Sequence, residues 1–232
     1  MVLVIFDVDG TLVHSDKKDS LTFAQAYEDL YGHPFPSIDW RNYPHVTDTV
    51  IFDTVLQQHF GRRAEAAEVE RFQAHYIGLL RDKRRQSPED YQAIPGAQQA
   101  VGQLAAQAEY IVGVATGGWR QPAELKLEHV GIRIAPRLFS GADGKAEREA
   151  ILEEVIARAR ESHGSALRKI VYVGDAEWDV RTTRNLQLAF IGLRRLGDCE
   201  TLHREGARHV IQDFTDFERF RQLLEEACPP GH

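Results

Sequence analysis

The stretch VLVIFDVDGT, residues 2–11, decides the expected fold. Five apolar residues run without interruption into two aspartates, Asp7 and Asp9, and then into Gly10 and Thr11. An uninterrupted apolar run of this kind is typical of a strand buried on both faces, as in a parallel sheet covered by helices. Two carboxylates at the end of such a strand repel each other, so they need a positive charge nearby.

Three further apolar runs repeat this pattern: YIVGVA at 110–115, KIVYV at 169–173 and LAFIGL at 188–193. Apolar residues at helical spacing separate the runs, over 98–108, 146–160 and, more briefly, 179–186. The alternation of strand and helix predicts a doubly wound α/β domain with a parallel sheet at its centre.

The segment from residue 15 to residue 88 interrupts this alternation. It contains no convincing buried strand, and its apolar residues instead form helical stripes over 21–31, 48–60 and 65–81. Thr47 precedes the second of these helices and reads as its N-cap. We therefore expect a helical insertion, residues 15–88, in an α/β core made of residues 1–14 and 89–232.

The composition narrows the class of protein. The chain has 232 residues, of which 43% are hydrophobic, and a net charge of -7, which indicates a globular protein with a sizeable core. The acidic balance argues against a nucleic-acid partner or an anionic membrane surface. Two cysteines give neither a disulfide framework nor a metal-binding spacing. Without a signal peptide or a membrane-length apolar segment, we expect a cytoplasmic protein.

Polar residues follow three of the four apolar runs. They are Asp7 and Asp9 after the first, Thr116, Gly117 and Gly118 after the second, and Asp175 and Asp179 after the third. Because ligands bind parallel sheets beyond the carboxyl ends of the strands, we expect these residues to meet at one edge. Asp7, Asp9 and Asp175 would crowd three carboxylates there, and Mg²⁺ would relieve their repulsion.

The same edge offers groups that suit a phosphate. Thr116 supplies a hydroxyl, and Gly117 and Gly118 leave backbone N–H groups accessible to an anion. Lys145, at the start of the helix expected from residue 146, is the natural positive partner of a phosphoryl group. The residues alone therefore predict a site for Mg²⁺ and a phosphate.

Taken together, these residues resemble the four motifs of the haloacid dehalogenase (HAD) superfamily, in its phosphatase branch. The motifs are D-x-D-G-T at residues 7–11, a strand-ending Thr116, a lysine at Lys145 and G-D-x-x-x-D at residues 174–179. The resemblance runs from residue 2 to about residue 193. It implies a Rossmann-like core, with residues 15–88 as a type 1 helical cap of the kind found in phosphoglycolate phosphatases.

The resemblance also implies a role for each residue. Asp7 would be the nucleophile that forms an aspartyl-phosphate, and Asp9 would act first as general acid and then as general base. Mg²⁺ would contact Asp7, the main-chain carbonyl of Asp9, Asp175 and a phosphate oxygen. Asp179 would orient Lys145 or a metal-bound water.

The remaining phosphate oxygens would be bound by Thr116, Lys145 and the backbone N–H groups of Val8, Asp9 and Gly117. One feature departs from the family's pattern. The family's lysine is often followed closely by proline, whereas residues 146–148 here read Ala-Glu-Arg. Arg148 is therefore the alternative to Lys145.

The activity implied is Mg²⁺-dependent hydrolysis of a small phosphate monoester. A sugar phosphomutase would use the same residues and is the alternative among enzymes. A phospho-accepting signalling domain also combines an aspartyl-phosphate with Mg²⁺, Thr and Lys, but such domains carry adjacent acids after the first strand and place the acceptor on a later strand. A dehalogenase generally lacks an acid at the position of Asp9. The sequence predicts neither the substrate nor the oligomeric state.

Overall fold

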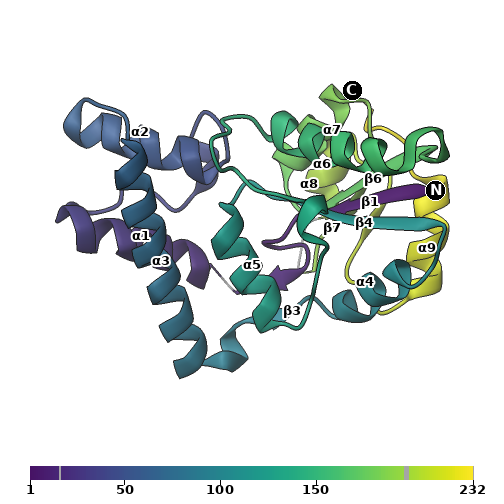
Figure 1. Cartoon of the computed structure of the whole chain (residues 1–232), viewed down its shortest axis with the longest axis horizontal. Helices are drawn as coiled ribbons and strands as arrows, with labels where there is room; N and C mark the ends of the chain where they lie inside the picture. Colours follow the sequence, from purple (N-terminus) through teal and green to yellow (C-terminus); the bar gives the residue numbers. More distant parts are fainter. Residues whose placement is uncertain (16, 196–198, 232) are drawn as a thin grey trace.

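A parallel sheet of six strands lies at the centre of the computed structural model, which describes residues 1–15, 17–195 and 199–231 (Figure 1). Its strand order is β5-β4-β1-β6-β7-β8. The strands are β1 (Val2–Phe6), β4 (Tyr110–Ala115), β5 (Phe139–Ser140), β6 (Lys169–Gly174), β7 (Ala189–Leu193) and β8 (Val210–Ile211). This confirms the predicted doubly wound sheet. The two-residue edge strands β5 and β8 are too short to leave an apolar run in the sequence.

Helices cover both faces of the sheet (Figure 1). One face carries α6 (Arg148–His163), α7 (Glu177–Asn185) and α8 (Cys199–Arg204), and the other carries α4 (Ala97–Ala105), α5 (Arg120–His129) and α9 (Phe217–Glu226). Within β1, Leu3 and Ile5 belong to the first apolar layer, and Val4 and Phe6 belong to the second. Because alternate residues of a strand point to opposite faces, a strand covered on both faces is apolar throughout.

Three long helices form a separate unit beside the sheet (Figure 1). They are α1 (Lys18–Tyr31), α2 (Asp48–Phe60) and α3 (Ala66–Gln86), and we call them the helical unit. Thr47 caps α2 by accepting a hydrogen bond from the Val50 amide, as the sequence predicts. The Phe23 ring lies 4.9 Å from that of Phe72 and 5.8 Å from that of Trp119 in the core. The helical unit therefore packs against the core through a shared apolar cluster.

The chain enters and leaves the helical unit through two adjacent crossings. The first crossing, which enters the unit, contains strand β2 (Val13–His14), and the return crossing contains strand β3 (Gln92–Ala93). These two strands pair antiparallel and hold the crossings together. The crossings lie close to the carboxyl end of β1, where the polar residues gather. The division of the chain into a core and a cap at residues 15 and 88 stays a prediction.

Candidate active site

The strand order places the carboxyl end of β1 where the connectivity of the sheet reverses. From β1 the chain proceeds to β4 and β5 on one side, and it then returns to β6, β7 and β8 on the other. Open α/β sheets bind their ligands outside the carboxyl ends of the strands at such a point. A cavity of about 540 Å³ opens there, and its lining includes Asp7, Asp9, Thr116, Arg148 and Asp175.

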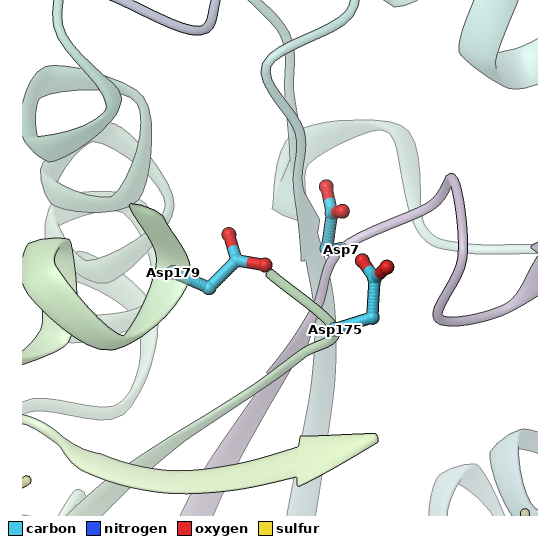
Figure 2. A group of neighbouring side chains, drawn as sticks. All are labelled: Asp7, Asp175 and Asp179. Atoms are coloured by element: carbon cyan, nitrogen blue, oxygen red, sulfur yellow. The ribbon is translucent and has the colours of Figure 1, made fainter. Parts of the chain in front are cut away.

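Three carboxylates converge at the ends of β1 and β6 (Figure 2). One oxygen each of Asp7, Asp175 and Asp179 lies within 4.8 Å of the other two. Burial and the Asp179 carboxylate raise the pKa of Asp7 to about 7. Burial and the carboxylates of Asp179 and Asp7 raise the pKa of Asp175 well above its usual range.

This cluster suits a divalent cation. The buried Oδ1 atom of Asp7 has no hydrogen-bond partner among the described residues. An ionised carboxylate in such surroundings is costly unless a positive charge lies against it. Mg²⁺ is bound by hard oxygen ligands, often one or two carboxylates. Asp7 and Asp175 therefore fit the ion that the sequence predicts.

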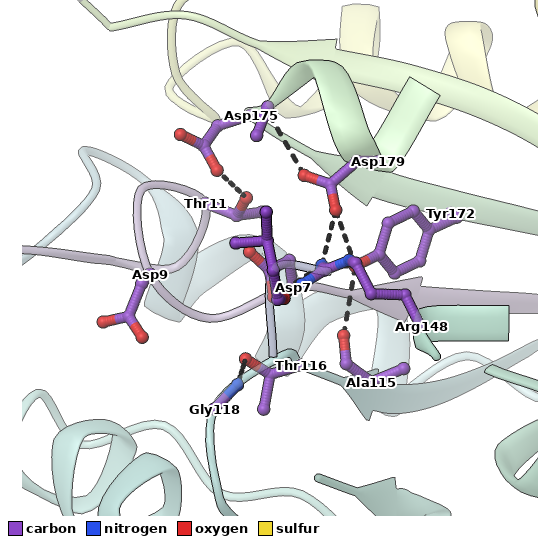
Figure 3. Close-up of polar contacts among 12 residues, drawn as sticks. Asp7, Asp9, Thr11, Ala115, Thr116, Gly118, Arg148, Tyr172, Asp175 and Asp179 are labelled. Atoms are coloured by element: carbon purple, nitrogen blue, oxygen red, sulfur yellow. Dashed lines mark hydrogen bonds and ion pairs between the residues drawn. The ribbon is translucent and has the colours of Figure 1, made fainter. Parts of the chain in front are cut away.

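Arg148 forms the cationic side of the cluster (Figure 3). Its Nη2 atom lies 2.5 Å from Oδ1 of Asp179 and 3.5 Å from Oδ1 of Asp7. It also donates to the Tyr172 hydroxyl at 3.0 Å. Asp179 is fully buried and accepts a second hydrogen bond from the Ala176 amide. Asp179 therefore fixes the guanidinium beside Asp7, and both are anchored by further contacts.

The structure does not bring Lys145 into this cluster. Its Nζ atom lies 2.8 Å from the Glu154 carboxylate and 3.4 Å from the Gly141 carbonyl, and the residue does not line the cavity. The helix expected from residue 146 begins at Arg148 instead. This shift leaves Lys145 in the preceding loop and places Arg148, the alternative named from the sequence, where Lys145 was expected.

Thr116 and two glycines follow β4 at the cavity. Thr116 is buried, and its hydroxyl oxygen accepts the Gly118 amide at 3.3 Å. Gly117 packs so closely against the Arg148 guanidinium and the Val46 carbonyl that an added Cβ would overlap both. This loop therefore requires glycine where the core meets the helical unit.

A tight turn follows β1, and its residues Asp9 and Gly10 line the cavity. The Val8 carbonyl accepts the Leu12 amide at 2.9 Å, which folds the chain back on itself. Gly10 has a φ of 82°, and a Cβ at this position would overlap the Asp175 carboxylate. The glycine of the D-x-D-G-T motif therefore allows the first strand's turn to approach the acid that follows β6.

The Asp9 side chain is directed away from Asp7 (Figure 3). Its two carboxylate oxygens accept hydrogen bonds from Nζ of Lys126 at 2.8 and 2.7 Å. Lys126 is buried on α5 and lies 3.9 Å from Asp19 of α1. Burial opposes the charged form, but Asp9, Tyr76 and Asp19 raise the pKa of Lys126, which is therefore a cation. The apolar pattern of the sequence does not predict α5, so nothing marks Lys126 as a site residue before the fold is known.

Asp48, the first residue of α2, reaches the cavity from the helical unit. Its Oδ2 atom accepts the Trp119 amide at 2.9 Å, and its own amide donates to the Gly117 carbonyl at 2.8 Å. Burial raises the pKa of Asp48 to about 7. The sequence indicated Thr47 as a helix cap but gave no sign that the next residue would face the cavity.

Comparison with known proteins identifies the protein as a hydrolase with an α/β fold. Residues 4–193 match the haloacid dehalogenase-like hydrolase family, and the chain belongs to that family. No protein of curated function matches the sequence. Within the described residues, no helix is both long enough and apolar enough to cross a membrane.

Several solved structures share the fold over nearly their whole length. A hydrolase from Pseudomonas syringae is 20% identical, with a TM-score of 0.69 over 96% of this chain and 98% of that chain. A candidate β-phosphoglucomutase from Bacteroides vulgatus is 15% identical, with a TM-score of 0.67 over 97% and 89%. A predicted phosphoglycolate phosphatase from Haemophilus somnus is 18% identical, with a TM-score of 0.57 over 95% and 97%. At these identities the similarity establishes the fold.

A buried ion pair ties the helical unit to its crossings. Nη2 of Arg84, on α3, lies 2.9 Å from Oδ1 of Asp19 on α1, and the two side chains are 4% and 6% exposed. The Arg84 guanidinium also stacks on the Tyr91 ring at 4.1 Å. Arg84 therefore joins the start of α1, the end of α3 and the return crossing.

We expect Arg84→Met to lower the free energy of unfolding by about 3–5 kcal/mol, because it leaves the Asp19 carboxylate buried with only Lys126 nearby. Urea denaturation followed by circular dichroism measures the change. Arg85→Met is the matched control, since the Arg85 side chain is 77% exposed and, among the described residues, pairs with the exposed Asp82 alone. Its expected effect is within about 0.5 kcal/mol. Equal effects of the two substitutions would contradict the structural role given to Arg84.

Proposed function

We propose that the protein is a Mg²⁺-dependent phosphomonoester hydrolase that acts on a small phosphorylated metabolite through an aspartyl-phosphate intermediate. The observation that carries this proposal is the juxtaposition of Asp7 and Asp175 at the floor of the cavity, with Thr116 and Arg148 beside them. Such a floor combines a nucleophile, oxygen ligands for a metal ion and donors for phosphate. The names of several structural neighbours, which include phosphatases, agree with it.

The acidic residues at this floor would hold the metal ion. Asp7, Asp175 and the main-chain carbonyl of Asp9 are the proposed ligands. When bound, Mg²⁺ neutralises charge that would otherwise keep an anionic ester away from the carboxylates. Asp179 would not need to bind the ion, because its oxygens already accept hydrogen bonds from Arg148 and Ala176.

Asp7 and Asp9 carry the proposed chemistry. A carboxylate oxygen of Asp7 attacks phosphorus while the bond between phosphorus and the alcohol oxygen breaks. Asp9 gives a proton to that oxygen, and it then takes a proton from the water that hydrolyses the aspartyl-phosphate. Asp9 lines the cavity but is bound to Lys126 in this structure, so its side chain must rotate toward Asp7 for these steps.

The phosphate oxygens are bound by groups from two strand ends and from the start of α6. We propose Thr116, the backbone N–H groups of Val8 and Gly117, and the guanidinium of Arg148, which takes the role that the sequence assigned to Lys145. Asp179 positions Arg148. The helical unit acts as the cap, closing the cavity against water during the reaction.

A phosphate-release assay with a panel of monoesters and Mg²⁺ tests the proposal. Release of inorganic phosphate that depends on Asp7 supports hydrolysis. Conversion of a sugar phosphate to its isomer without phosphate release would replace it with the phosphomutase alternative. A phosphoryl group that persists on Asp7 without turnover would instead indicate a signalling domain.

The proposed metal ligands predict how phosphate release depends on Mg²⁺. We expect EDTA to abolish phosphate release and added Mg²⁺ to restore it. Asp175→Asn should raise the Mg²⁺ concentration needed for half-maximal activity by about tenfold or more, because an amide oxygen is a weaker ligand than a carboxylate. A titration of activity against Mg²⁺ measures the shift. An unchanged titration in the Asp175→Asn variant would remove Asp175 from the ligand set.

A further inference from the structure

The wall of the cavity that belongs to the helical unit contains two acidic side chains, Asp19 and Asp48, and no basic side chain; Asp19 is paired with Arg84, which lies outside the lining. The unit spans residues 18–86, all of which the structure describes, and its lining residues are Asp19, Ser20, Phe23, Trp40, Val46, Asp48, Ile51 and Tyr76. None of them is a lysine, arginine or histidine. The wall is otherwise apolar and aromatic, apart from the Ser20 hydroxyl. The leaving group of an ester bound at Asp7 would face this wall.

Three cations of the core line the cavity: Lys126, Arg148 and Arg194, which directly follows β7. The first two are engaged by carboxylates. Lys126 donates to both oxygens of Asp9, and Arg148 is paired with Asp179 and Asp7. Lys17, in the segment that leads into α1, also lines the cavity, and its side chain is exposed. The residues of the helical unit that line the cavity therefore include no cation that could bind a second anionic group on the substrate.

Asp48 is the acid of this wall that lies nearest the phosphate-binding loop. Oδ2 is held by the Trp119 amide, and it lies 3.6 Å from the place that a Cβ of Gly118 would occupy. Thr49 fixes the same turn of α2, since its hydroxyl accepts from the Trp119 indole at 3.0 Å and donates to the Ala142 carbonyl at 2.6 Å. The carboxylate is therefore fixed within a short distance of a phosphate bound at Thr116.

We propose that the substrate is a phosphate monoester whose alcohol carries a hydroxyl or ammonium group that donates to Asp48, and that carries no carboxylate or second phosphate. This inference rests on the proposed function and adds the class of substrate. A donor facing Asp48 forms a charge-assisted hydrogen bond. A second anion in the same place meets the like charge of the Asp48 carboxylate, which is an element of discrimination against the wrong substrate. Phe23, Trp40 and Tyr76 pack against the carbon atoms of the alcohol.

Three esters of nearly equal size test this inference. They are 2-hydroxyethyl phosphate, O-phosphoethanolamine and 2-phosphoglycolate, whose terminal groups are neutral, cationic and anionic. We expect kcat/KM of the wild-type protein to be at least about tenfold higher for one of the first two than for 2-phosphoglycolate. The ratio between the first two tells whether the donor is a hydroxyl or an ammonium group.

Asp48→Asn assigns the discrimination to one side chain. An asparagine oxygen can still accept the Trp119 amide, so the turn is kept while the charge is lost. We expect the variant to raise kcat/KM for 2-phosphoglycolate relative to 2-hydroxyethyl phosphate by about tenfold. Asp53→Asn is the matched control on the same helix, since Asp53 accepts the Ala64 amide and does not line the cavity. It should leave the ratio unchanged.

The outcomes separate this inference from the proposed function. Asp7-dependent hydrolysis in which 2-phosphoglycolate is the best of the three esters would overturn the inference and leave the proposed function intact. An unchanged ratio in Asp48→Asn would also overturn it. Absence of Asp7-dependent hydrolysis of any ester, including p-nitrophenyl phosphate, would overturn both.

Discussion

Asp7→Asn is expected to lower kcat for phosphate release by at least about 10⁴-fold, because the amide that replaces the carboxylate cannot attack phosphorus. The Asp7 carboxylate lies at the end of β1, buried, with Asp175 beside it at the cavity floor. We do not expect Asp9 to replace it, since the Asp9 carboxylate is bound to Lys126 in this structure and serves as the acid and base of the proposed reaction when it rotates toward Asp7. A single-turnover assay with p-nitrophenyl phosphate measures the loss.

The same substitution should leave the fold intact or make it more stable. The raised pKa of Asp7 means that the folded state disfavours its ionised form, so this residue's contribution to stability falls as the pH rises from about 4 to about 7. Asparagine removes that cost. In EDTA, we expect the thermal midpoint of Asp7→Asn to equal or exceed that of the wild type, with the larger gain at pH 8. Retained activity would contradict the role of Asp7 as nucleophile, and a lowered midpoint would contradict the account of its surroundings.

The central strands could be predicted because burial on both faces leaves a plain mark in the sequence. β1, β4, β6 and β7 each appear as an apolar run within one residue of their observed bounds. The edge strands β5 and β8 pair over two residues each, and their position depends on neighbours that are distant in the chain. The helix α5 could not be predicted because much of it is polar and lacks a simple apolar stripe, and its Lys126 is directed at Asp9 and Asp19.

The site was predictable where residues directly follow a strand. Asp7, Thr116 and Asp175 end three neighbouring strands of one parallel sheet, so the topology alone brings them together. Lys126 and Asp48 come from helices, and whether a helical residue faces a cavity depends on how its helix packs against the core. That packing leaves no local signal in the sequence.

Lys145 and Arg148 illustrate the same limit. Both are cations near the start of α6, and only the position of the first helical turn decides which one lies beside Asp7. Glu147 is the N-cap residue, so Arg148 is the first residue of the helix. A difference of two residues in the expected helix start is therefore enough to change the predicted phosphate ligand.

Arg148→Met is expected to lower kcat/KM by about 10²–10³-fold, the usual effect of removing a fixed donor from a developing negative charge. The guanidinium lies 3.5 Å from the Asp7 carboxylate and lines the cavity, so its loss removes both the proposed phosphate ligand and the cation that lies beside Asp7. It also leaves Asp179 fully buried without its cation, which should lower the free energy of unfolding by about 3–5 kcal/mol. Steady-state kinetics at a temperature well below the unfolding midpoint measures the first effect.

Two further variants separate catalysis from folding. Arg148→Lys keeps the charge but cannot contact Asp179, Asp7 and the Tyr172 hydroxyl together, so it should retain more stability than Arg148→Met and recover only part of the activity. Lys145→Met removes a cation that pairs with Glu154 outside the cavity, and we expect kcat/KM to change by less than about threefold. The opposite ranking, with Lys145→Met inactive and Arg148→Lys fully active, would restore Lys145 as the phosphate ligand. That result would require the loop before α6 to rearrange when substrate binds, because Lys145 lies outside the cavity lining in this structure.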